Sequence, residues 1–132
     1  MGLIVEIITP KGKYATLDVA SLTVKLTSGY RTILKDHTPL IGSLDYAPMH
    51  VHVNNKPEYY ALHGGAINIT KEKVTLVCNA IEHVKDIDID RAKRAKERAE
   101  TRLKSKDEDI DTKRAMLALK RAIARIETYS KR

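Results

Sequence analysis

Four arginines and one aspartate in the last third of this 132-residue chain have spacings that would bring their side chains together. Asp88 stands three residues before Arg91, and Arg98 follows Arg91 by seven, so a helix would carry all three on one face. Arg121 and Arg125, four residues apart, would share a face of a second helix. If the two helices fold back on each other, four guanidinium groups converge beside an acid. Because guanidinium binds phosphate oxygens through paired hydrogen bonds, the pattern predicts a polyphosphate site.

Helical patterns over residues 88–104 and 109–129 provide those two elements. Asp86 and Asp88 are candidate N-caps of the first helix, and the polar residues 105–108 favour an antiparallel hairpin. The expected seam is rich in alanine: Ala92, Ala95, Ala99 and Leu103 in the first helix, and Ala115, Leu119, Ala122 and Ile126 in the second. Small side chains bury little area, so the hairpin must dock on another surface. A weakly held hairpin that can also open into a rod about 60 Å long is a two-state element.

Residues 1–84 have the pattern of a β domain. Short apolar, β-branched segments alternate with turn residues, among them Pro10-Lys11-Gly12, Ser28-Gly29 and Asn54-Asn55. About ten short strands are expected, among them residues 40–44, 49–53, 59–62 and 66–69, with Gly64-Gly65 as the turn of a hairpin between the last two. The strands would form two facing sheets around one apolar core. The predicted fold class is therefore α+β, with an N-terminal β-sandwich over residues 1–84 and a C-terminal helical hairpin over residues 85–132. The chain has no Phe and no Trp, so Val, Ile, Leu, Ala and Tyr must build the core.

The net charge of +7 belongs almost wholly to the predicted hairpin. Residues 1–84 carry 8 basic and 7 acidic side chains, whereas residues 85–132 carry 16 and 10. A basic excess of this kind indicates an anionic ligand, a nucleic acid or an acidic protein surface, and it is also typical of a solvated helical face.

Other kinds of chemistry have little support in the sequence. His50 and His52 would share one face of a strand, but no further ligand stands at metal-binding spacing, so surface histidines are expected. Cys78 lies in an apolar strand, and a single cysteine excludes an internal disulfide. No nucleophile with its base and no pair of carboxylates stands out, so we predict no catalytic residue and no metal site. We find no apolar run that could cross a bilayer and no secretory signal, and direct membrane insertion is not expected.

Several segments, taken in order, resemble the epsilon subunit of bacterial F-type ATP synthase. Ile87-Asp88-Ile89-Asp90-Arg91-Ala92 is similar to the ATP-binding motif I/L-D-x-x-R-A of the Bacillus-type members. The other matching segments are Thr9-Pro10-Lys11-Gly12, residues 33–40, His63-Gly64-Gly65 and the arginine-bearing residues 119–126. The resemblance covers essentially the whole chain.

This resemblance implies a non-catalytic subunit of the central stalk, or rotor, of the proton-translocating synthase. The strand domain would bind the gamma subunit and the ring of c subunits, in a complex that also contains alpha and beta subunits, on the cytoplasmic side of the cell membrane. The hairpin would inhibit ATP hydrolysis when it extends along gamma, and ATP, as a regulatory ligand, would stabilise its folded form. The implied site consists of Arg91, Arg98, Arg121 and Arg125 at the phosphates and of Ile87, Asp88 and Ala92 at the adenosine end, with Glu82 helping. A requirement for magnesium stays open.

Two alternatives remain at this stage. The chain could be the same rotor subunit without nucleotide binding, its hairpin moved by partner contacts alone. It could also be a basic helical module that binds nucleic acid, with an affinity that falls steeply with salt. The second is disfavoured because ten acids are interleaved with the basic residues and only Tyr129 offers a ring for stacking in residues 85–132.

Overall fold

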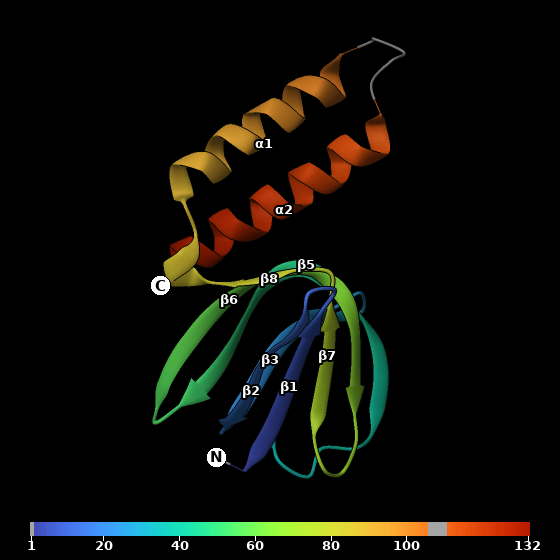
Figure 1. Ribbon diagram of the computed structural model, residues 1–132, viewed down its shortest axis with the longest axis vertical. Coiled ribbons are helices and arrows are strands. Elements are labelled where there is room, and N and C mark those ends of the chain that lie inside the picture. The colour runs from blue at the N-terminus through green and yellow to red at the C-terminus, as the bar shows by residue number, and fades with distance from the viewer. Residues whose placement is uncertain (1, 106–110) are drawn as a thin grey trace.

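The computed structural model describes residues 2–105 and 111–132, in which a β-sandwich is followed by a helical hairpin (Figure 1). Residues 106–110, which contain most of the predicted break and the start of the predicted second helix, lie outside the described residues. In the described part there are eight strands, a 3-10 turn and two helices. Their bounds are β1 Leu3–Thr9, β2 Gly12–Val19, β3 Ser21–Leu26, β4 Gly29–Ile33, β5 Leu40–Val53, β6 Lys56–Ile69, β7 Val74–Cys78, β8 Ile81–His83, η1 Val84–Asp86, α1 Ile89–Lys104 and α2 Thr112–Lys131.

The strands follow one hydrogen-bonded path that folds over on itself to make the two layers. The order is β2-β1-β7-β6-β5-β3-β4, and β8 pairs separately with β6. All the pairings are antiparallel except that of β1 with β7. A hairpin of two 14-residue strands, β5 and β6, contributes to both layers, and its turn uses Asn54 and Asn55 at positive φ.

The number of strands is eight in the described residues rather than about ten, because two expected breaks do not end a strand. The predicted strands at 40–44 and 49–53 are parts of β5, and those at 59–62 and 66–69 are parts of β6. The local sequence predicts a turn at Gly64-Gly65, but the two glycines only bend β6 while its pairing with β5 continues on both sides. Pairing with a long neighbouring strand thus overrides a local turn preference.

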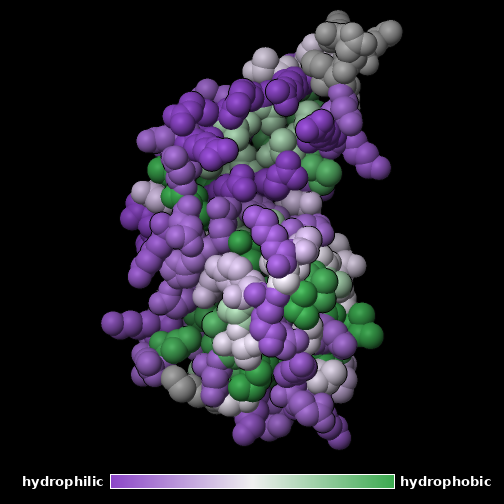
Figure 2. All heavy atoms as spheres, viewed as in Figure 1, coloured by the Kyte–Doolittle hydropathy of each residue, from purple (hydrophilic) through white to green (hydrophobic). Residues whose placement is uncertain are grey.

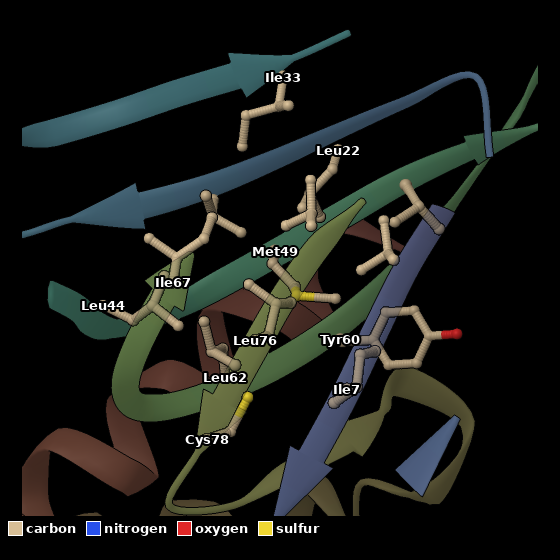
Figure 3. Packing of buried hydrophobic residues seen from close by; sticks show 14 of the residues in the cluster. Ile7, Leu22, Ile33, Leu44, Met49, Tyr60, Leu62, Ile67, Leu76 and Cys78 are labelled. Atoms are coloured by element: carbon tan, nitrogen blue, oxygen red, sulfur yellow. The ribbon is translucent and has the colours of Figure 1, made fainter. Parts of the chain in front are cut away.

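The core lies between the layers and is aliphatic, as the composition requires (Figure 3). Its inward-facing side chains come from alternate positions of the strands, and many are fully buried. The largest of them are Ile7, Leu22, Ile33, Met49, Leu62, Ile67, Ile69 and Leu76. Cys78 is buried in the same cluster, as predicted, and Tyr60 closes one side of it.

The bend at Gly64-Gly65 decides which strand lies beside each half of β6. After the bend, β6 pairs with β7, and before it β6 pairs with β8. Gly65 has a φ of 136°, and a Cβ there would stand 2.1 Å from the carbonyl oxygen of Val77. The backbone hydrogen bond from His63 N–H to the Ala80 carbonyl, 3.0 Å long, holds the start of β8 against β6. As a result, His63 and Glu82 come together on the outer face of the sheet.

The two helices begin at aspartate N-caps. The Asp88 and Asp111 carboxylates accept hydrogen bonds from the backbone N–H groups of Arg91 and Arg114, both 3.1 Å long. The predicted cap at Asp88 is therefore confirmed, whereas Asp86 lies in η1 and does not cap α1.

The helix α2 has two buried faces. Ala115 and Ala122 face the alanines of α1, as the predicted seam requires, while Ala124 and Thr128 lie on the opposite side of α2. That opposite side packs on β5 and β6, so α2 lies between α1 and the sandwich (Figure 1). In the described part of the chain, neither helix combines the length and apolar character needed to cross a bilayer.

Candidate functional site

A cavity of about 330 Å³ lies where the hairpin meets the end of the sandwich. Its lining comes from the consecutive elements β8, η1 and α1 and, further along the chain, from α2. The lining residues are Glu82, Asp86, Asp88, Arg91, Ala92, Ala95, Arg98 and Arg125. Because Arg125 comes from α2 and Arg91 from α1, this cavity is complete only while the helices are folded back on each other.

One face of α1 supplies half of the lining. Ala92 and Ala95 line the cavity together with Arg91 and Arg98, which stand two turns apart on α1. Asp88 is held at the start of α1 by its N-cap hydrogen bond. The positive end of the α1 dipole and two guanidinium groups therefore lie at the same side of the cavity, an arrangement that favours an anion.

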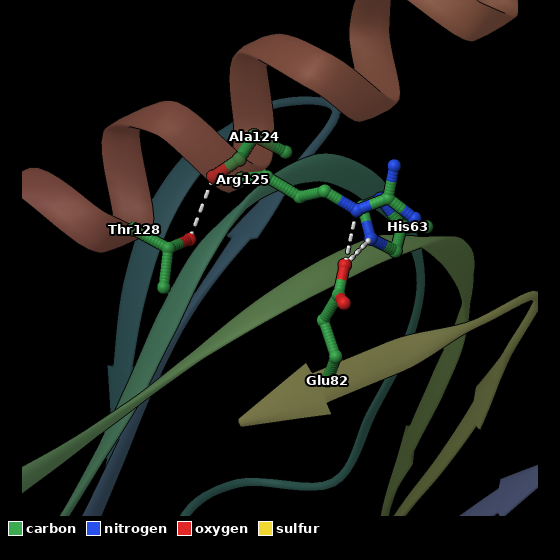
Figure 4. Close-up of polar contacts among 5 residues, drawn as sticks. All are labelled: His63, Glu82, Ala124, Arg125 and Thr128. Carbon is green, nitrogen blue, oxygen red and sulfur yellow. Dashed lines mark hydrogen bonds and ion pairs between the residues drawn. The ribbon is translucent and has the colours of Figure 1, made fainter. Parts of the chain in front are cut away.

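The opposite side of the cavity is formed by Arg125, which is bound to Glu82 (Figure 4). The Arg125 Nε–H donates to Oε1 of Glu82, and His63 Nε2 stands 3.2 Å from the same oxygen. Burial acts to raise the pKa of Glu82, but the hydrogen bonds and charges of His63 and Arg125 outweigh it and lower that pKa below its ordinary value. Glu82 is therefore an ionised group that joins the sandwich to α2.

The charges in the cavity lining are balanced. Three guanidinium groups stand against the carboxylates of Glu82, Asp86 and Asp88. Asp88 is engaged at the helix N-terminus and Glu82 at Arg125, which leaves the guanidiniums of Arg91 and Arg98 as the cations available to a ligand. An anion with several oxygens could bind these two directly and compete with Glu82 for Arg125. Figure 2 shows hydrophilic side chains covering most of the visible surface of the hairpin.

Six of the eight site residues proposed from the sequence line this cavity: Glu82, Asp88, Arg91, Ala92, Arg98 and Arg125. Ile87 is buried beside it, 7% exposed, with its N–H bonded to the Val84 carbonyl. Arg121 is not part of the lining, although it is partly buried one turn before Arg125.

The structure adds two lining residues that the sequence analysis did not assign to the site, Asp86 and Ala95. The spacing of Ala95, three residues from Ala92 and three from Arg98, was the signal that could have found it. Among the described residues, no group of three or more His, Cys, Asp and Glu side chains is arranged to hold a metal ion.

A second cleft, of about 710 Å³, lies at the other end of the sandwich. The loop after β4 and the turn between β6 and β7 form it, at the end remote from the hairpin in Figure 1. Its lining runs from Pro39 to Ile41 and from Asn68 to Glu72. Ile41 in this lining is 79% exposed, and Leu34 nearby in the sequence is 57% exposed. Such apolar exposure is typical of a surface that contacts another protein.

Comparison with known proteins places both parts of the chain. Residues 3–84 match the family described as the ATP synthase delta/epsilon chain beta-sandwich domain, and residues 85–130 match its long alpha-helix domain. The chain belongs to the delta/epsilon family of ATP synthase subunits. It is 42% identical over 124 residues to the ATP synthase epsilon chain of Natranaerobius thermophilus, covering 92% of this chain and 88% of the relative. It is also 39% identical to the epsilon chain of Bacillus cytotoxicus, covering 93% and 92%.

These matches confirm the family predicted from the sequence and, with it, a non-catalytic subunit of the synthase. Solved structures agree on the fold. A chain of the Euglena gracilis mitochondrial ATP synthase superposes with a TM-score of 0.82 at 19% identity, covering 93% of this chain and 78% of that one. A central-stalk/c-ring structure of the Tetrahymena thermophila synthase gives a TM-score of 0.60 at 18% identity, covering 99% and 96%.

Proposed function

We propose that the chain is a rotor subunit of an F-type ATP synthase whose hairpin senses ATP. One observation carries the regulatory part: Arg91 and Arg98 of α1 and Arg125 of α2 line one cavity that needs the folded hairpin. A ligand that binds only this form stabilises it by RT ln(1 + [L]/Kd), about 2.7 kcal/mol at a hundredfold excess over Kd. The triphosphate would bind the guanidinium groups, while Ile87, Asp88 and Ala92 would shape the adenosine end.

Two rearrangements would accompany nucleotide binding. The phosphates would take Arg125 from Glu82, and Arg121 would turn toward the cavity from its place one turn earlier on α2. A folded hairpin keeps α2 on the sandwich, so it cannot extend along a neighbouring gamma subunit. Inhibition of ATP hydrolysis would therefore require the open hairpin, and ATP would relieve it.

The proposed partners follow from the family. The relatives are named ATP synthase epsilon chains, and the two structural neighbours belong to synthase structures that include a c-ring. We assign the c-ring contact to the cleft beside Ile41 and Leu34, because it is apolar and lies at the end of the sandwich remote from the hairpin. The gamma subunit would bind the sandwich, with alpha and beta subunits nearby, and the complex would place the chain at the cytoplasmic face of the membrane.

Calorimetry of the chain with ATP, with and without Mg²⁺, tests nucleotide sensing. We expect binding that Arg91→Ala, Arg98→Ala or Arg125→Ala each weakens about tenfold or more, because each removes a charge-assisted hydrogen bond to phosphate. Arg94→Ala is the matched control, since Arg94 also lies on α1 but is not part of the cavity lining. Absence of binding at millimolar ATP, or equal loss in the control, would refute the assignment.

The second candidate is a rotor subunit whose hairpin does not bind nucleotide. The pairing of Arg125 with Glu82 favours it, because that guanidinium already has an anionic partner within the chain. This candidate predicts inhibition of hydrolysis that stays the same from micromolar to millimolar ATP in the reconstituted complex. Relief of inhibition by ATP, abolished in Arg91→Ala, would decide for the first candidate.

A further inference from the structure

Small side chains form part of the surface that joins α2 to the sandwich. On the sheet, Pro48 and Ala61 are paired neighbours of β5 and β6, and both are buried. On the helix, Ala124 is 1% exposed and Thr128 is 0% exposed. The Thr128 hydroxyl donates to the Ala124 carbonyl within α2, 2.7 Å away, so its hydrogen is used inside the helix and not on the sheet. These small side chains offer few atoms that could interlock, so by themselves they define the position of the helix on the sheet weakly.

A series of polar contacts links α2 to the sheet across this surface. Glu82 Oε1 accepts from Arg125 on α2 and stands 3.2 Å from Nε2 of His63 on β6 (Figure 4). Because an ionised carboxylate can only accept, Nε2 of His63 carries the hydrogen of this contact. Among the described residues, Nδ1 of His63 is the buried side-chain polar atom that has no hydrogen-bond partner. The side-chain hydrogen bond that His63 makes in the described part of the chain is therefore the one to Glu82.

The orientation of the Glu82 carboxylate depends on a second hydrogen-bond donor. It lies in the three-residue strand β8, and its side chain is 25% exposed. Without a second donor, the carboxylate could rotate toward water and leave Arg125, because a partly exposed ion pair gains little from one contact. A second contact between α2 and the sandwich places Lys120 over the Tyr46 ring, 6.0 Å from its centroid, and a long contact of this type constrains the helix weakly.

We propose that His63 is a positioning residue: it holds the Glu82 carboxylate toward α2, so that Arg125 docks the hairpin at one place on the sheet and completes the cavity. The histidine contacts no ligand in this scheme and acts through Glu82. The proposal does not depend on nucleotide binding, and its test uses the full chain without nucleotide.

Hydrogen exchange of the backbone amides of α2 measures how often the hairpin leaves the sheet. His63→Leu keeps most of the volume and removes the unpartnered Nδ1, so a role in packing alone predicts unchanged or slower exchange. A positioning role predicts α2 exchange about tenfold faster, because a hydrogen bond to a charged group is lost. His63→Gln, whose side-chain amide can donate in place of Nε2, should restore most of the protection. Amides of β1 and β7 report whether the sandwich is folded in each variant.

A double-mutant cycle shows whether His63 acts through Glu82. Glu82→Leu, which removes the acceptor, should by itself accelerate α2 exchange, and adding His63→Leu to it should have little further effect. His37→Ala, in the loop between β4 and β5, is the control and should change nothing in α2. The proposal is overturned if His63→Leu keeps its full effect in the Glu82→Leu background, or if His63→Gln exchanges as fast as His63→Leu.

Discussion

Replacing Gly65 by alanine should destabilise the sandwich through its backbone. The φ of 136° is one that L residues rarely adopt, and occupying such a region costs about 1–3 kcal/mol. The added Cβ would stand 2.1 Å from the Val77 carbonyl oxygen and 2.9 Å from the Cα of Cys78. Since these are backbone atoms, no side-chain rotation relieves the contact and β7 must move away. Distorting the hydrogen bonds between β6 and β7 adds about 1–3 kcal/mol, so the expected loss is about 4 kcal/mol.

Thermal unfolding followed by circular dichroism measures this loss. For a chain of this size, 1 kcal/mol corresponds to about 3–4 °C in Tm, so Gly65→Ala should lower Tm by about 15 °C. Gly29→Ala is the matched control, because its φ is 122° and its added Cβ would meet nothing within 4 Å. It should show the conformational cost alone, about 1–3 kcal/mol. Equal Tm values for the two variants would refute the claim that the close approach of β7 requires a glycine.

Three further predictions concern single groups. Burial acts to raise the pKa of Glu82, but His63 and Arg125 lower it below the ordinary value of 4.5 in the docked state. The contribution of Glu82 to docking is therefore complete above pH 4.5 and is lost as the pH falls through the lowered pKa of the docked state. Exchange of α2 amides should therefore accelerate below that pH in the native chain but not in Glu82→Gln. Asp88→Ala should cost about 1 kcal/mol by removing the N-cap of α1, measured by urea unfolding, whereas Asp88→Asn should cost less than half of that. Burial raises the pKa of the Cys78 thiol to about 12, so a maleimide at pH 8 should modify it only on unfolding. Val77→Cys, at a position 51% exposed, should add a thiol that reacts at once.

Much of the fold could be predicted from local pattern. The alternation of apolar and polar residues indicated strands, and the aspartates with the alanine seam placed α1 and α2 within a few residues of their observed limits. The spacing of Arg91 and Arg98 was sufficient to put them on one face of α1, and both line the cavity. The prediction was wrong at the two long strands, where glycine and proline in the sequence indicate turns. Pairing between β5 and β6 keeps both strands continuous in spite of these residues.

The placement of Arg121 shows the limit of this approach. A four-residue spacing puts it near Arg125 on a helix, but the neighbours of each guanidinium depend on how α2 is rotated on the sheet. With Ala124 and Thr128 against the sheet, Arg125 reaches Glu82 and lines the cavity, whereas Arg121 does not line it. Helical periodicity carries no information about that rotation.

The sequence by itself determined the kinds of element, their order, the aliphatic core, the family and the position of Arg91 and Arg98 on one face of α1. All of these depend on the spacing of residues a few positions apart or on similarity along the chain. Only the tertiary structure decided that His63, Glu82 and Arg125 meet, because these residues are 19 and 43 positions apart in sequence. Their meeting requires the bend at Gly65 and the docking of α2, which arise from contacts between distant segments.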